Sequence, residues 1–247
     1  MEFERARRAA GGWTQVEATG STNADLVAAA RTDPGLPHLT VLLTRDQRAG
    51  RGRLDRVWRA PAGAALAVSV LVRVPEVPLA ARGWIPLVAG AAMARAVSAQ
   101  LDAHEVGVKW PNDVLVDGRK ICGILAEGTL DPGAVVIGSG VNTSMRTEDL
   151  PVPTATSFAA LGAACDEDAL LADYLGELDR LLAALGAGRT AQVRDAVRRR
   201  CLTLGREVTV SLPDGSSLRG LASDLDAEGR LMVAGRGVSA GDVVHVR

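Results

Sequence analysis

Residues 106–123 read VGVKWPNDVLVDGRKICG, and this stretch decides how the chain is expected to fold. Short apolar runs alternate within it with polar turn formers, a pattern typical of short β-strands. The pair Asp117-Gly118 is a strong signal for a two-residue hairpin turn, because both residue types tolerate the positive φ angles of such a turn. Consecutive strands joined by tight turns indicate antiparallel pairing. Four successive strands are therefore predicted, at residues 106–110, 114–116, 121–127 and 134–140.

The same stretch contains Lys109 and Lys120, the only lysines among the 28 basic residues of the chain. A lysine ammonium is a compact charge on a flexible stem, whereas a guanidinium is a planar fork, so the two are not interchangeable at a binding site. The alternative is that a strong arginine bias leaves two neighbouring lysines by chance. The stretch is therefore the first candidate for a catalytic or binding site.

Apolar periodicity predicts further elements on both sides of this stretch. Ser21 or Thr22 caps a predicted helix over residues 22–31, since a hydroxyl accepts from the free amides of a first helical turn. Pro86 is expected near the first turn of a long helix over residues 79–101, because a proline deeper inside would break it. The remaining predicted elements are strands over residues 14–18, 39–44 and 66–74, a helix from Asp166 to Leu185, and a helix over residues 190–202.

The region from Arg206 to the C-terminus contains only alternating strand patterns and turns such as Pro213-Asp214-Gly215. This pattern is typical of a small β barrel of about five strands. A boundary near Leu204-Gly205 divides the chain into a larger domain, residues 1–204, and a small domain, residues 205–247. The expected fold class is therefore α+β, with a mixed or antiparallel sheet flanked by helices and a small C-terminal barrel.

The composition excludes several classes of protein. A net charge of −1 over 247 residues argues against a general nucleic-acid coat, which needs an overall basic balance. Three cysteines without metal-ligand spacing suit a reducing compartment. The N-terminus lacks the apolar core of a signal peptide, and the longest apolar run is interrupted by Pro86 and Arg95, so it falls short of the ~18 residues of a membrane span. We expect a cytoplasmic protein without a DNA or membrane partner.

Residues 45–59 form an unusual segment between two predicted strands, with six arginines against two aspartates and with glycines at positions 50 and 52. Glycine permits close approach of the backbone to a phosphate, and arginine supplies paired donors for its oxygens. We interpret the segment as anion-binding, and we do not expect it to pack as part of a helix or strand. The alternative is a solvated charged loop. Neither the dinucleotide-binding glycine pattern nor a Walker-type phosphate loop is present.

Four motif segments follow one another along the chain. They are Ser21-Thr22-Asn23; Gln47 with Gly50-Arg51-Gly52-Arg53 and Trp58; Lys109-Trp110-Pro111-Asn112-Asp113 with Lys120 and Gly123; and Gly138-Ser139-Gly140-Val141-Asn142. In this order and spacing they resemble the biotin protein ligases. Each motif is weak alone, but the ordered set is highly specific and spans the chain from about Thr14 to its end. The resemblance implies a catalytic domain similar to that of class II synthetases and an SH3-like C-terminal barrel.

The resemblance implies an enzyme that activates biotin with ATP to biotinyl-5′-AMP and pyrophosphate, and then transfers the biotinyl group to one lysine. The implied acceptor is the biotin carboxyl carrier protein of an acetyl-CoA or other acyl-CoA carboxylase. Mg²⁺ is implied with ATP, held largely by phosphates and water, and its protein ligands are unknown. Some family members also repress genes through an N-terminal helix-turn-helix. Residues 1–13 alone precede the first predicted strand, so we expect no repressor function. A monomer and a homodimer both fit the sequence.

By match to the family, Lys120 bonds the biotin carboxylate and the α-phosphate, Arg53 neutralises phosphate charge, and Asp113 orients the acceptor lysine. Plain structural roles also exist, namely helix capping for the segment around Thr22 and packing for Trp58. The implied biotin contacts are Ser21, Thr22, Asn23, Gln47, Arg51, Gly52, Arg53, Lys120 and Gly123. The implied ATP and adenylate contacts are Arg51, Arg53, Trp58, Lys109, Asn112, Lys120 and Asn142.

The nearest alternative is a lipoate or octanoate protein ligase or transferase, which shares the fold and also acylates a carrier lysine. The Gly-Arg-Gly-Arg segment together with Lys-Trp-Pro-Asn-Asp favours biotin. A non-catalytic biotin sensor or DNA regulator is a third reading, and it needs a DNA-binding element. One departure from the family pattern is Leu54-Asp55, where a basic or polar residue and a glycine are usual. The exchange is expected to stiffen the segment and to alter how slowly the adenylate escapes.

Repulsion among its arginines predicts that residues 48–56 are poorly ordered without a ligand and become ordered around the adenylate. Limited proteolysis with and without biotin plus ATP measures this order. We expect cleavage within these residues to slow several-fold when both substrates are present. Equal cleavage rates under the two conditions would contradict the prediction.

Overall fold

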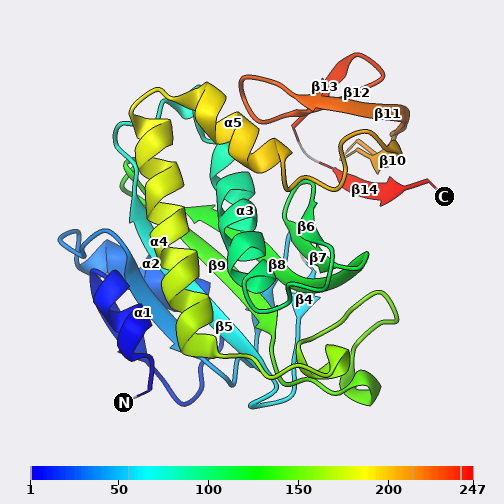
Figure 1. The fold of residues 1–247 in the computed structure, drawn as a ribbon. Helices are drawn as coiled ribbons and strands as arrows, with labels where there is room; N and C mark the ends of the chain where they lie inside the picture. The colour runs from blue at the N-terminus through cyan, green and yellow to red at the C-terminus, as the bar shows by residue number, and fades with distance from the viewer. Residues whose placement is uncertain (1, 55, 213, 240, 247) are drawn as a thin grey trace.

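The computed structural model describes residues 2–54, 56–212, 214–239 and 241–246 as an α+β fold with two large β-sheets (Figure 1). The main sheet contains β1 (Gly12–Gln15), β2 (Thr40–Thr44), β5 (Ala65–Arg73), β6 (Val106–Lys109), β7 (Asp113–Val116), β8 (Arg119–Gly128) and β9 (Ala134–Asn142). The C-terminal sheet contains β10 (Glu207–Ser211), β11 (Ser217–Leu225), β12 (Leu231–Val233), β13 (Arg236–Val238) and β14 (Asp242–His245), and a separate hairpin pairs β3 (Gly50–Arg51) with β4 (Val57–Trp58). The helices are α1 (Glu4–Ala9), α2 (Thr22–Thr32), α3 (Trp84–Ser98), α4 (Glu167–Gly186) and α5 (Thr190–Arg198), with 3-10 turns at Leu79–Ala81, Thr147–Asp149 and Ala159–Leu161.

The main sheet is mixed, in the order β1-β2-β5-β9-β8-β7-β6. Only β1 and β2 run parallel, and the other neighbours are antiparallel. The predicted turn at Asp117-Gly118 is confirmed, because the two residues join β7 to β8 with φ angles of 48° and 76°. The four strands predicted after residue 105 are present with small shifts at their ends. The expected fold class, a mixed sheet flanked by helices, is confirmed.

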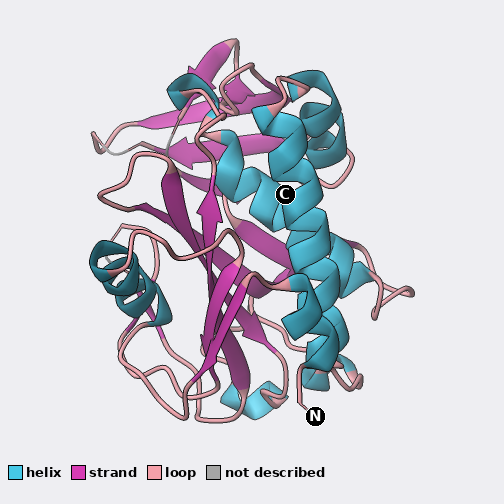
Figure 2. Cartoon of the chain, turned by 90° about the vertical axis from the view of Figure 1, so that its left-hand side faces the viewer, coloured by secondary structure: helices cyan, strands magenta, loops and turns pink. Residues whose placement is uncertain are grey.

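Helices lie on both sides of the main sheet (Figure 2). On one side, α3 packs against β6, β7, β8 and α4, and α4 also contacts α1. On the other side, α2 packs against β2, β5 and β9. Strand β5 serves both layers, because its side chains alternate: Val68 and Val70 belong to the large core shared with α3 and α4, while Leu71 packs with Leu26 of α2. The short α2 leaves much of its side of the sheet free for a ligand site.

The helix ends follow the predicted capping in two places. Ser21 Oγ accepts from the Ala24 amide at 3.4 Å, and Asp166 Oδ1 accepts from the Ala169 amide at 3.0 Å. Helix α3 is shorter than the predicted helix over residues 79–101, because it begins only at Trp84 after a 3-10 turn. Pro86 then falls in the first turn, as expected. Helix α1 is a six-residue element that the sequence pattern did not predict.

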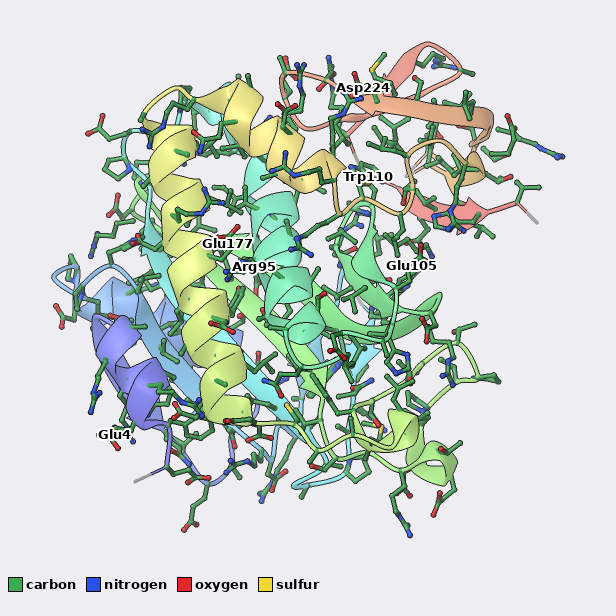
Figure 3. The ribbon with its side chains drawn as sticks, viewed as in Figure 1. Glu4, Arg95, Glu105, Trp110, Glu177 and Asp224 are labelled. Carbon is green, nitrogen blue, oxygen red and sulfur yellow. The ribbon has the colours of Figure 1, made fainter. Side chains whose placement is uncertain are left out.

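The C-terminal sheet has the expected five strands, in the order β13-β12-β11-β10-β14. Among the described residues its edge strands β13 and β14 do not pair with each other, so closure into an SH3-like barrel is not confirmed. Pro213, part of one predicted turn, lies outside the described residues. Two tryptophans connect the sheet to the rest of the protein: Trp84 Nε1 donates to Ala227 O at 2.9 Å, and Trp110 Nε1 donates to Gly229 O at 3.4 Å. Figure 3 shows Trp110 at this junction.

A search of the described helices for membrane spans found none that combines the necessary length with sufficient apolar character. Trp110 and Cys122 are packing residues of the core, since each is at most 2% exposed. Burial raises the pKa of the Cys122 thiol to about 12, so this cysteine is a core residue and not a nucleophile.

We predict that His245 on β14 makes the stability of the junction between the two sheets sensitive to acid. Its Nε2 lies 3.2 Å from Thr203 Oγ1, which accepts from the Trp110 amide. Burial first, and then the charges of Arg206 and Lys109, lower the pKa of His245 from 6.5 to about 4. The unfolded chain therefore binds a proton that the folded chain excludes, and stability is lost as pH falls from 6.5 towards about 4.

The melting temperature measured across this pH range tests the prediction. We expect the loss of stability on acidification to be smaller in a His245→Gln variant, because glutamine does not titrate. Parallel pH profiles for the variant and the parent protein would contradict it.

Candidate active site

A cavity of about 410 Å³ opens on the side of the main sheet that carries α2. Its walls come from the N-terminus of α2, the β3–β4 hairpin, the turn between β6 and β7, and strand β14. The motif segments singled out in the sequence therefore meet at one place. The predicted site residues that line the cavity are Ser21, Thr22, Asn23, Gln47, Arg51, Gly52, Arg53, Trp58, Lys109, Asn112, Asp113, Lys120 and Gly123.

Asn142 is the predicted site residue that the structure places elsewhere. It ends β9 opposite Ala65, and its Nδ2 donates to Thr156 O at 2.9 Å, so its amide is used within the protein. It is not among the residues that line the cavity. Contact of Asn142 with a nucleotide stays a prediction.

The polar end of the cavity is built around the first turn of α2. Gln47 Oε1 accepts from the Thr22 amide at 2.9 Å and lies 3.0 Å from Thr22 Oγ1. Ser69 Oγ, from the middle of β5, lies 2.8 Å from Thr22 Oγ1 and 2.6 Å from Asn23 Oδ1. Sequence analysis missed Ser69, although a single serine within the apolar run of β5 was a usable signal. These hydrogen bonds fix the orientation of each polar group before a ligand arrives.

Glycines of β8 and β9 form the floor. A Cβ on Gly138 would lie 2.4 Å from Asn23 Oδ1, and a Cβ on Gly140 would lie 2.6 Å from Trp58 Cε2. A Cβ on Gly123 would lie 3.0 Å from Lys120 Nζ. The missing side chains therefore let Asn23, Trp58 and Lys120 approach the sheet closely, which is why glycine occurs here within strands.

Cations of the site are held by carboxylates from different strands. Lys120 Nζ lies 2.6 Å from Asp113 Oδ1, and Arg51 Nη2 lies 2.9 Å from Glu127 Oε2. A third ion pair joins the hairpin to the C-terminal sheet, between Arg56 and Asp242. Glu127 and Asp242 were not predicted as site residues, and Arg56 was predicted only as one arginine of the anion-binding segment 45–59. Local sequence carries no signal for them, because their partners are distant in the chain.

Lys109 and Arg53 form no ion pair within the described part of the chain. Arg53 Nη1 instead donates to Asn112 Oδ1 at 3.1 Å. Burial lowers the pKa of both Lys109 and Arg53, and Asp113 partly offsets this in each case. Among the described residues these two cations have no carboxylate in direct contact, and their partial burial favours an anionic ligand that would supply negative charge.

The arginine-glycine segment differs from its predicted form. Gly50 pairs with Trp58 and Arg51 with Val57, so the segment contains a short antiparallel hairpin where no strand was expected. Backbone hydrogen bonds between β3 and β4 thus form this hairpin although its sequence lacks the alternating apolar residues typical of strands. Asp55, part of the Leu54-Asp55 departure from the family pattern, lies outside the described residues. The predicted order on ligand binding remains a prediction.

Metal ligation by the protein does not fit this cavity. Within the described ranges no group of three histidine, cysteine or acidic side chains is placed to hold an ion. The carboxylates in and beside the cavity, Asp113, Glu127 and Asp242, are each engaged by a cation.

The fold and the cavity together define a protein with a site of about 410 Å³ whose partly buried cations favour a small anionic ligand. Comparison with known proteins narrows this class. The biotin/lipoate A/B protein ligase family matches residues 17–142, and the C-terminal domain of biotin protein ligases matches residues 203–246. The chain belongs to the biotin/lipoate A/B protein ligase family.

Relatives match over most of the chain. The biotin–[acetyl-CoA-carboxylase] ligase of Mycobacterium tuberculosis is 43% identical over 97% of this chain and 92% of its own length. The protein of the same name from Paracoccus denitrificans is 32% identical over 88% of this chain and 92% of its own length. A biotin protein ligase from Aquifex aeolicus, solved in complex with biotin and ATP, covers 96% of this chain and 99% of its own, with a TM-score of 0.76. At 22% identity this last likeness shows the fold.

Because the glycines of β8 and β9 are in close contact with other side chains, we predict that one added methyl group lowers the stability of the protein. Gly138→Ala places a Cβ against Asn23, whose amide is held by other hydrogen bonds, and we expect a loss of about 1–3 kcal/mol in the free energy of unfolding. Urea denaturation measures this loss. Gly128→Ala, at the end of β8, is the matched control, since a Cβ there meets nothing within 4 Å. Equal stability of the two variants would contradict the prediction.

Proposed function

We propose that this protein is an ATP-dependent biotin protein ligase. It converts biotin and ATP to biotinyl-5′-AMP and pyrophosphate, and then transfers the biotinyl group to a lysine of the biotin carboxyl carrier protein of an acetyl-CoA or related carboxylase. The observation that carries the proposal is that the motif segments shared with this family line one cavity. The similarity to two biotin–[acetyl-CoA-carboxylase] ligases over most of their length supports the choice of biotin.

The polar end of the cavity is the proposed site of the biotin ring. A ureido group presents one carbonyl and two N–H donors, and it needs a few fixed polar partners within a partly apolar cleft. Ser21, Thr22, Asn23 and Gln47 offer hydroxyl and amide groups there. Gly123, together with the other glycines of the floor, leaves the space that the ligand occupies.

The first step requires two anions to meet. A biotin carboxylate oxygen attacks the α-phosphorus of ATP, a new P–O bond forms, and pyrophosphate leaves with the electrons of the broken bond. Lys120, Arg53 and Lys109 place positive charge around this point and offset the repulsion. Arg51 and Gly52 of the hairpin cover the mixed anhydride and exclude water from it. Trp58 and Asn112 border the proposed nucleotide side.

Transfer to the carrier needs a neutral amine. Asp113 is the proposed group that receives and orients the acceptor lysine, whose ammonium must lose a proton before it attacks the biotinyl carbonyl. An amide bond forms and AMP leaves. Asp113 is paired with Lys120 in this structure, so the proposed role begins when the anionic adenylate engages Lys120.

Mg²⁺ is part of the proposed ATP substrate, bound by phosphate oxygens and water. A cytoplasmic location is proposed from the free cysteines, Cys122, Cys165 and Cys201, which suit a reducing compartment.

The experiment that tests the function is biotin-dependent release of pyrophosphate from ATP, with lipoate and octanoate as parallel substrates and a biotin carrier domain as acceptor. We expect release with biotin and labelling of one carrier lysine. Activity with lipoate or octanoate alone would move the protein to the other branch of its family, which includes lipoate ligases. No turnover with any of the three would contradict an enzymatic function.

Lys120→Ala is expected to lower the rate of adenylate formation by about 100-fold or more, because it removes charge stabilisation at the reacting anions. Arg119→Ala is the matched control, since Arg119 is the preceding residue of β8 and does not line the cavity. Single-turnover formation of biotinyl-5′-AMP measures both variants. An active Lys120→Ala enzyme would remove this lysine from the mechanism.

A further inference from the structure

Glu127, near the end of β8, joins the wall of the cavity to the hairpin beside it. Its Oε2 accepts from Asn23 Nδ2 at 2.7 Å and from Arg51 Nη2 at 2.9 Å. Asn23 and Arg51 both line the cavity, whereas Glu127 lies just outside it. One carboxylate oxygen therefore contacts two residues that come from different elements and face the same ligand space.

The first contact fixes which way the Asn23 amide points. Asn23 Nδ2 donates to Glu127 and also to Leu125 O at 3.2 Å, while Ser69 Oγ donates to Asn23 Oδ1 at 2.6 Å. A flipped amide would place its oxygen against a carboxylate and a carbonyl, which repel it. Both amide hydrogens are thus used within the protein. What remains of the amide for a ligand is the second lone pair of Oδ1, which accepts a hydrogen bond and cannot donate one.

The second contact restrains Arg51. Only Nη2 is engaged by Glu127, and a guanidinium carries five N–H donors, so Nη1 and Nε remain available for a ligand anion. The side chain of Arg51 is 49% exposed and that of Glu127 is 26% exposed, so this ion pair contributes little to the stability of the fold. The ion pair instead orients Arg51: it holds the guanidinium at the cavity while some of its N–H donors remain available.

We propose that Glu127 is a positioning residue that sets the acceptor orientation of Asn23 and holds Arg51 in place for the phosphate of the adenylate. The proposal rests on the proposed ligase function, because it concerns the ligands of that reaction. Glu127 itself touches neither substrate. Through one oxygen it makes the biotin end of the cavity and the covering hairpin depend on each other.

Two variants separate the two contacts. Glu127→Gln keeps an amide oxygen that accepts from Asn23, but it removes the negative charge that holds Arg51. Glu127→Ala removes both contacts. Glu177→Gln is the matched control: Glu177 is also a half-buried glutamate paired with an arginine, Arg180, but it lies on α4 beside α3 (Figure 3).

The readouts are the KM for biotin and the dissociation rate of biotinyl-5′-AMP. For Glu127→Gln we expect a biotin KM within about twofold of the parent and adenylate dissociation about tenfold faster, as for loss of one hydrogen bond to a charged group. For Glu127→Ala we expect the biotin KM to rise about tenfold as well. In an Arg51→Ala background, Glu127→Gln is expected to have no further effect on adenylate dissociation, because its target is already absent.

Three outcomes overturn the proposal. The first is Glu127→Ala kinetics that match those of Glu177→Gln. The second is a fall in kcat and melting temperature with unchanged biotin KM and adenylate dissociation, which indicates a structural role. The third is that the effects of Glu127→Gln and Arg51→Ala on the rate of adenylate dissociation are additive. In each case the parent protein still forms the adenylate, whereas failure of the parent to form it contradicts the ligase function itself.

Discussion

The pairing of β8 with β9 is the constraint on which the whole site depends. It sets Gly123 opposite Gly140 and Leu125 opposite Gly138, so three of these four cavity-lining residues are glycines and Leu125 is the one bulky side chain among them. Asn23 and Trp58 then approach the backbone of β9 more closely than any Cβ would allow. A shift of one residue in this register would exchange the faces and fill the cavity with side chains.

The arrangement of charge follows from this open face. Lys120 and Arg51 project over it and are held by carboxylates, whereas Lys109 and Arg53 are partly buried without such a partner in the described residues. Burial of positive charge is unfavourable, so an anion bound among these cations would stabilise them. The cost of burying this positive charge therefore favours the binding of an anionic ligand.

The C-terminal sheet forms a layer of its own and also contributes to the cavity. Trp84 and Trp110 donate to carbonyls of its β11–β12 turn, and Asp242 of β14 pairs with Arg56 of the hairpin segment. The cavity therefore has one wall from the small sheet. A small region that is distant in sequence thereby restrains the segment that faces the ligand.

Much of the fold and of the site was accessible from local sequence. Strand alternation, the Asp117-Gly118 turn and the Ser21 cap depend on neighbouring residues, and their physical preferences act over a few positions. The hairpin at Gly50 and the strand order of the C-terminal sheet were not accessible, because strand pairing satisfies backbone groups between segments without a local signal.

The sequence by itself determined the order of the elements, the family motifs and the residue types that line the site. Only the tertiary structure decided which of them meet. It brought Ser69 against Asn23, placed Glu127 between Asn23 and Arg51, paired Asp113 with Lys120, and turned the Asn142 amide towards Thr156. The physical reason is that hydrogen bonds and ion pairs between distant residues depend on sheet register and side-chain direction, which long-range packing fixes.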